Sequence, residues 1–97
     1  MEYNIKGFRV FEDILKCKWT LSILDRLRNG DVRPGHLKSN IKGITAKVMY
    51  ERLKKLEKFG IIERDQITEK PLEVHYILTS KGKKVSKIIS QMKKIDF

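Results

Sequence analysis

The 97-residue sequence predicts a mainly α-helical fold with one small β-ribbon, an α+β arrangement. Three observations point to this fold class. Apolar residues recur at helical spacing between Thr45 and Gly60, apolar and polar residues alternate after Gly60, and a second helical stripe closes the chain. No internal repeat, low-complexity tract or linker-like segment divides the sequence. We therefore expect residues 1–97 to form a single domain.

The first half of the chain is expected to form three helices, at residues 8–16, 18–28 and 34–41. Apolar residues recur at helical spacing in each segment. Asn29-Gly30-Asp31 marks the end of the second helix, because these residue types favour turns. Pro34 suits the first turn of the third helix, where the N–H that proline lacks would have no partner.

A fourth helix is expected at residues 45–59, after a short turn. Gly43 lies in this turn and can adopt the positive φ that other residues resist. The hydroxyl of Thr45 can then accept from the backbone N–H groups of the first helical turn. The apolar stripe of this helix comprises Met49, Leu53 and Leu56. A helix anchored by this stripe would turn a polar, mostly basic side outward.

Residues 61–79 predict a two-stranded wing. The first strand is expected from Ile61 to Ile67, and the residues from Asp65 to Leu72 connect it to the second. The second strand is marked by Val74, Tyr76 and Leu78, which alternate on one face. Pro71 belongs in the connection, because proline cannot pair in a central strand position. Together with the two helices before it, this ribbon completes a winged helix-turn-helix.

A last helix at residues 80–95 carries an apolar stripe that needs a surface to cover it. The helix at residues 8–16 has the same requirement. Two interpretations stay open: both helices pack on their own domain, or they dimerise with a second copy of the chain about a two-fold axis. We favour the dimer, because a chain of this size buries only about two-thirds of its unfolded surface. The expected interface residues are Phe8, Phe11, Leu15, Val85, Ile88, Ile89, Met92 and Ile95.

The formal net charge of +10 indicates a polyanionic partner. Between Ile44 and Gly60, five basic residues stand against two acidic ones, whereas residues 61–79 hold two basic and four acidic residues. The helix after Gly43 is therefore expected to bind double-stranded DNA, and the wing is the weaker electrostatic arm. The residues expected to contact DNA are Arg33, Lys38, Lys42, Thr45, Ala46, Lys47, Tyr50, Glu51, Lys54 and Lys70.

Sequence-specific binding requires side chains that pair with base edges in a groove. Lysine can donate to guanine, Glu51 can accept from cytosine, and the methyl groups of Thr45 and Ala46 can contact thymine. Glu51 has a second interpretation, an ion pair with Lys47 or Lys55 along the helix. The lysines of the last helix also have two interpretations: they form a solvated face, or they flank the DNA site.

Other chemistry finds little support in the sequence. His36 and His75 are far apart and lack the spaced cysteine partners of a zinc site. The glycines are too dispersed for a phosphate-cradling loop, and no acidic residue has a visible catalytic pocket. We therefore expect no metal, no cofactor and no enzymatic activity. The competing function is a winged-helix module for contact with protein or RNA. The basic helix face disfavours protein contact, and the lack of aromatic stacking platforms disfavours single-stranded RNA.

The sequence also predicts a cytoplasmic location. No apolar run reaches the roughly 20 residues of a membrane span. Charged residues interrupt the apolar residues near Met1, so neither a secretory signal nor membrane association is expected. The single cysteine, Cys17, cannot form an internal disulfide, which fits a reducing compartment.

Short motifs are distributed along most of the chain, in the order Cys17-Lys18-Trp19-Thr20, Ile23-Leu24, Gly30, Arg33, Gly43-Ile44-Thr45, Leu53-Lys54-Lys55-Leu56-Glu57, Gly60-Ile61-Ile62, Arg64, Pro71, Tyr76-Ile77-Leu78-Thr79 and Gly82. In this order and spacing they resemble the HxlR-type winged helix-turn-helix regulators, which are related to the MarR group. The resemblance implies a homodimeric bacterial or archaeal transcription factor, with the helix after Gly43 in the major groove and the wing along the backbone or the minor groove. It also implies a small-molecule effector in some relatives.

The chain departs from the family pattern in three places. Many relatives carry a cysteine upstream of the Lys-Trp pair, where it can serve as a thiol sensor, but the segment from Tyr3 to Gly7 contains none. Cys17 stands where the family usually has glycine, and we interpret it either as a small buried residue or as a redox sensor. Pro34-Gly35 replaces the aromatic residue that the family has after the position of Arg33.

Overall fold

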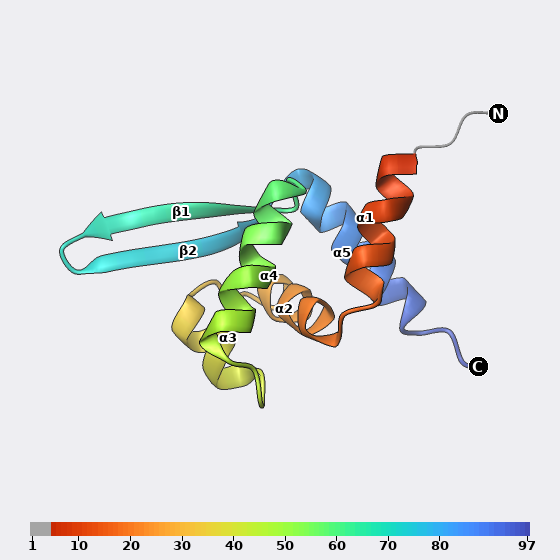
Figure 1. Cartoon of the computed structure of the whole chain (residues 1–97), viewed down its shortest axis with the longest axis horizontal. Helices are drawn as coiled ribbons and strands as arrows, with labels where there is room; N and C mark the ends of the chain where they lie inside the picture. The colour runs from red at the N-terminus through yellow and green to blue at the C-terminus, as the bar shows by residue number, and fades with distance from the viewer. Residues whose placement is uncertain (1–4) are drawn as a thin grey trace.

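The computed structural model describes residues 5–97, so Tyr3 and Asn4 of the Tyr3–Gly7 segment lie outside the described residues. The elements follow in the order α1 (Ile5–Leu15), α2 (Lys18–Arg28), α3 (Pro34–Asn40), α4 (Ala46–Lys58), β1 (Ile62–Glu69), β2 (Leu72–Leu78) and α5 (Ser80–Met92). Figure 1 shows the β1–β2 ribbon extending from one side of the helices, with α1 and α5 on the other. The predicted fold class, a mainly helical winged helix-turn-helix with a two-stranded ribbon, is confirmed.

The core forms around α2, which packs against each of the other helices and against β2. From α4, the predicted stripe of Met49, Leu53 and Leu56 is buried. From α2, the buried aliphatic residues are Ile23, Leu24 and Leu27. Full burial of each such side chain stabilises a fold by about 1.5–3 kcal/mol. The stripe therefore determines which side of α4 faces the protein and which side faces solvent.

Both ends of α4 have well-formed caps. The Thr45 hydroxyl accepts from the backbone N–H of Val48 at 3.2 Å, and Gly43 in the preceding turn has a φ of +87°. At the other end, Gly60 has a φ of +74°. The Gly60 N–H donates to Glu57 at 2.9 Å and the Ile61 N–H donates to Leu56 at 3.0 Å, which is the Schellman arrangement. These caps set where the helix begins and ends.

The connection between the two strands of the wing is shorter than expected. The strand β1 continues to Glu69, and only Lys70 and Pro71 form the turn. The pairing persists because an irregularity between Gln66 and Thr68 lets the ladder resume as far as Glu69 opposite Leu72. The expectation that Asp65 to Leu72 form the connection was therefore wrong for most of that segment.

The base of the wing is tied to the segment before α3. The backbone N–H of Tyr76 on β2 donates to the carbonyl oxygen of Val32 at 2.8 Å. Val32 therefore pairs with the edge of β2 that β1 leaves open. Because Arg33 and Pro34 follow directly, this bond links the position of the wing to the start of α3.

The outer helices end at other residues than expected. Among the described residues, α1 covers Ile5–Leu15, so it includes residues before Phe8, the expected start. The helix α5 ends at Met92 instead of residue 95. The N–H of Ile95 donates to Met92, three residues back, at 3.2 Å, so the chain tightens into a turn. Ile95 is thus not part of the helical stripe.

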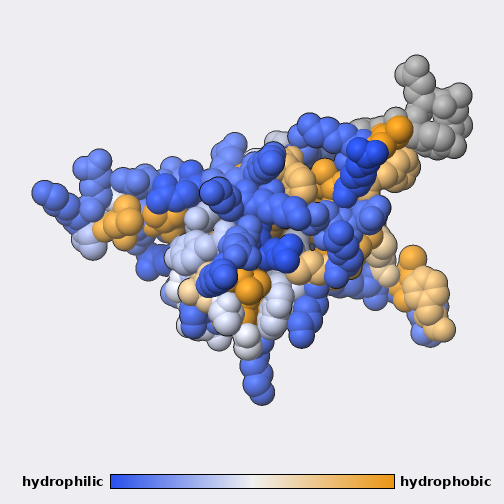
Figure 2. All heavy atoms as spheres, viewed as in Figure 1, coloured by the Kyte–Doolittle hydropathy of each residue, from blue (hydrophilic) through white to orange (hydrophobic). Residues whose placement is uncertain are grey.

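The apolar residues of α1 and α5 divide into two groups. Ile14, Val85 and Ile89 belong to the chain's own core, with Phe11 packed against it. Val85 and Ile89 retain only 8% and 5% of their accessible surface. The exposed group consists of Ile5, Phe8 and Leu15 on α1 and Ile88 and Met92 on α5, and Ile95 is exposed beyond the end of α5. In Figure 2, hydrophobic residues gather near the start of α1 and at the C-terminal end of the chain. Among the described residues, no helix is long and apolar enough to cross a membrane.

Candidate nucleic-acid interface

The outward side of α4 carries the side chains predicted to read DNA. Lys47, Tyr50, Glu51 and Lys54 are exposed, with Tyr50 at 49% of its full accessibility. The buried stripe on the opposite side prevents the helix from rotating about its axis without exposing apolar surface. The helix α4 is thus fixed with its polar side toward solvent, and Figure 1 shows it at the front of the molecule.

The other predicted contact residues are exposed as well. Lys38 lies on α3, Lys42 in the turn after it, and Thr45 and Ala46 at the start of α4. Together with α4 they form a continuous segment of the helix-turn-helix. Lys70 lies apart from them, in the turn at the tip of the wing.

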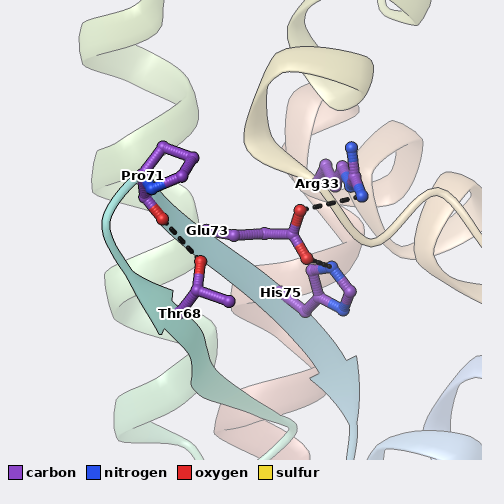
Figure 3. A network of polar contacts seen from close by, with 5 residues as sticks. All are labelled: Arg33, Thr68, Pro71, Glu73 and His75. Atoms are coloured by element: carbon purple, nitrogen blue, oxygen red, sulfur yellow. Dashed lines mark hydrogen bonds and ion pairs between the residues drawn. The ribbon is translucent and has the colours of Figure 1, made fainter.

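Arg33 differs from the other predicted contact residues, because it already has a partner. Its guanidinium Nη2 lies 2.9 Å from Oε1 of Glu73 on β2. Figure 3 shows this ion pair joining the residue before α3 to the part of β2 that follows the turn of the wing. Arg33 was expected to contact DNA, whereas in this structure its guanidinium faces a carboxylate of the same chain.

His75 lies beside the same carboxylate as Arg33. Its side chain is 24% exposed, and its Nε2 lies 3.3 Å from Oε2 of the same Glu73. The Nε2 atom is buried and makes no hydrogen bond of suitable geometry. The distance therefore places the imidazole beside the carboxylate, but not in an aligned hydrogen bond.

The alternative interpretation of Glu51 can be compared with the ion pairs of the structure. Within the described residues, Glu51 lies in no ion pair, and Lys55 pairs instead with Asp13 on α1. That pair connects α4 to α1 from a position at the edge of the buried stripe. The Glu51 carboxylate accordingly lies on the exposed side of α4, where it is open to solvent.

Cys17 lies half-buried at the start of α2. Burial raises the pKa of the thiol, but hydrogen bonds from the Thr20 side chain and from the Thr20 and Trp19 backbone outweigh it and lower that pKa below its ordinary value. The charge of Arg52 acts in the same direction. The thiolate is thus favoured by local donors, although the side chain is partly shielded.

Two features of the site were not anticipated. The Arg33–Glu73–His75 cluster joins residues about 40 positions apart, and the only sequence signal was that Glu73 and His75 alternate on one face of the same strand. The Lys55–Asp13 pair had no signal at all. No group of three or more His, Cys, Asp or Glu side chains in the described part of the chain is placed to hold a metal ion.

The fold and the site together define a class of protein. A helix-turn-helix whose second helix presents a basic, solvent-facing side, followed by a wing, is the arrangement of helix-turn-helix DNA-binding regulators. The family described as HxlR-like helix-turn-helix matches residues 14–96 of the chain. The chain belongs to this family, and it is a transcriptional regulator and not an enzyme.

Individual relatives agree with this assignment. The HTH-type transcriptional regulator YvaP of Bacillus subtilis strain 168 is 37% identical over 82 residues, covering 84% of this chain and 76% of that protein. A solved MarR-family regulator from Enterococcus faecalis V583 superposes with a TM-score of 0.81 at 30% identity, over 95% of this chain and 84% of that one. The reduced form of the regulator YodB from B. subtilis gives 0.80 at 30% identity, over 96% and 89% of the two chains.

Proposed function

We propose that this regulator binds double-stranded DNA sequence-specifically as a homodimer, with α4 of each subunit in the major groove. One observation carries the proposal. The buried stripe of α4 turns Lys47, Tyr50, Glu51 and Lys54 toward solvent along one side of a capped helix. An α-helix fits the major groove, and only there do all four base pairs present distinct patterns.

The exposed residues divide into two roles. Lys47, Glu51 and the methyl groups at the start of α4 have the chemistry to read bases, because lysine donates to guanine and a carboxylate accepts from cytosine. Lys38 and Lys42 lie beside this helix and are suited to phosphates, which position a protein without specifying sequence. The wing tip adds Lys70, and the net charge of +10 favours association with any duplex.

The dimer is proposed from the apolar residues left exposed on α1 and α5. Ile88 retains 45% and Met92 43% of full accessibility, and Leu15 of α1 is also exposed. We leave Val85, Ile89 and Phe11 out of the proposed surface, because they pack in or against the chain's own core. A two-fold dimer would present two α4 helices to half-sites about one helical turn apart, roughly 34–36 Å.

A gel-shift experiment tests the proposal. The full chain is incubated with duplex fragments of its own genome, with competitor RNA in a parallel series. We expect retention of a small set of duplex fragments that RNA does not displace. Equal competition by RNA would indicate an RNA-binding module, and no shift with any fragment would contradict DNA binding.

A further inference from the structure

Three side chains meet where the wing passes the start of α3, in an arrangement that the DNA-binding proposal does not use. The Glu73 carboxylate lies between two nitrogen groups, with Oε1 2.9 Å from Arg33 and Oε2 3.3 Å from His75. Figure 3 shows Arg33 and His75 approaching this carboxylate from different elements. Among the described residues, Glu73 is the only ion-pair partner of either one.

The cluster is connected to the DNA-binding helices through Arg33, which directly precedes α3. Arg33 is the N-cap residue of α3, and the preceding carbonyl of Val32 accepts the backbone bond from β2. The Arg33 side chain is half-exposed, so its guanidinium can reach solvent or a phosphate without unfolding the wing. His75 is more enclosed, and its Nε2 atom is shielded from water.

Other charges lie on the elements packed against β2, but Glu73 is the only described carboxylate within ion-pair distance of His75. They include Asp65 on β1, which is paired in register with His75, Arg28 on α2, His36 and Lys38 on α3, and Lys83 and Lys87 on α5. Glu73 is therefore the dominant electrostatic partner of a proton on His75.

We propose that His75 sets the DNA affinity of this regulator by controlling, through Glu73, whether the charge of Arg33 is available to a phosphate. When His75 is neutral, Glu73 neutralises Arg33. When His75 gains a proton, Glu73 is shared between two cations, the cluster changes from neutral to a net charge of +1, and Arg33 turns to the DNA backbone. Histidine is the side chain type whose ordinary charge change falls between about pH 5 and pH 8. The inference rests on the proposed function, since it requires DNA binding.

The direction in which DNA affinity changes with pH follows from thermodynamic linkage. An additional cation near phosphates strengthens binding, so DNA affinity rises as the pH falls. By reciprocity, DNA binding must take up a proton from solution. A partly exposed ion pair contributes little, and the corresponding change is roughly twofold to fivefold in Kd.

The test compares His75→Gln with the wild-type chain by fluorescence anisotropy on one operator duplex, at about pH 8 and about pH 6 and at constant salt. His36→Gln is the matched control, because His36 is the other histidine of the chain and is exposed on α3. For each protein, the Kd at the lower pH is divided by its Kd at the higher pH. We expect the gain in affinity at the lower pH to be roughly twofold to fivefold larger for wild type and His36→Gln than for His75→Gln. The same pH dependence in His75→Gln as in wild type would overturn the proposal.

A Glu73→Gln variant separates release of Arg33 from a purely structural role of the ion pair. If loss of the Glu73 charge releases Arg33, Glu73→Gln should bind DNA more tightly than wild type at the higher pH and gain little further affinity at the lower pH. Weaker binding at both values would mean that Glu73 only holds the wing in place, and would also overturn the proposal.

A measurement on the free protein keeps this inference separate from the proposed function. NMR titration of the wild-type and Glu73→Gln chains follows the His75 imidazole and the Arg33 side-chain signals. We expect the Arg33 signals to shift together with protonation of His75 in the wild type only. If the Arg33 and His75 signals are coupled but no duplex binds, the proposed function is contradicted and the contact between the side chains is not. If the signals are not coupled, the inference is contradicted, with or without DNA binding.

Discussion

Lys47 and Lys54 stand on the exposed side of α4, and neither forms an ion pair within the described residues. We expect Lys47→Ala and Lys54→Ala each to weaken operator binding about tenfold, equivalent to about 1.4 kcal/mol. Removal of one lysine–phosphate interaction should also flatten the dependence of log K on log salt by about 0.9. Lys84→Ala, an exposed lysine on α5, is the control. Unchanged affinity in both α4 variants would place the interface elsewhere.

Cys17 should react as a thiolate at a lower pH than an ordinary cysteine, because Thr20 and nearby donors stabilise its charged form. The measurement is the rate of alkylation against pH, for the native and the urea-unfolded chain, and the native midpoint is expected to be lower. Thr20→Val should move that midpoint upward. Since the pKa is lowered on folding, thiolate stabilisation adds to folding only above the unfolded pKa, and it is lost as the pH falls through the folded value. Coincident native and unfolded midpoints would contradict this interpretation.

At the residue scale, periodicity predicted which α4 side chains face outward, because burial repeats every 3.6 residues and Met49, Leu53 and Leu56 follow that repeat. Periodicity could not predict the partners of Arg33. The carboxylate that pairs with Arg33 belongs to Glu73, on a strand whose register against Val32 depends on the tertiary fold. The charge of Arg33 was thus visible in the sequence, whereas its neutralisation was not.

The contact between α5 and the turn before β1 depends on Gly82. A methyl group on Gly82 would overlap the backbone carbonyl of Ile61, which also accepts from the Thr79 backbone N–H at 3.0 Å. We expect Gly82→Ala to lower the free energy of unfolding by about 1–3 kcal/mol. The control is Gly35→Ala in α3, where nothing lies within 4 Å of the added carbon. It should raise stability by about 0.5–1 kcal/mol. Urea denaturation followed by circular dichroism measures both, and equal stabilities would contradict the packing described.

At the element scale, the sequence predicted helix ends correctly where single residues determine them. The start of α4 at Thr45 and its end near Gly60 follow from a capping hydroxyl and a positive φ, which are properties of single residues. The length of β1 was underestimated because strand pairing, and not the polarity of Thr68 and Glu69, determines where the turn begins. The end of α5 was overestimated because the apolar Ile95 continued the pattern past the last helical hydrogen bond.

At the scale of the whole molecule, the exposed apolar residues of α5 predict a specific effect of charge. Ile88→Lys combined with Met92→Lys should convert a dimer to a monomer in sedimentation velocity at micromolar concentration, because two lysines would lose their hydration at the interface. Loss of the second α4 helix should then weaken operator binding by about a hundredfold. Leu72→Lys, at an exposed apolar position on the wing, should leave the mass unchanged. A wild-type chain that sediments as a monomer would contradict the proposed dimer.

The central claim is that α4 lies in the major groove, and methylation interference on a selected operator fragment tests it most directly. Methyl groups at guanine N7 project into the major groove and block hydrogen bonds there. We predict two clusters of interfering guanines about one helical turn apart, with weaker interference for the Lys47→Ala variant. Binding that is indifferent to N7 methylation throughout the protected site would contradict the placement of α4.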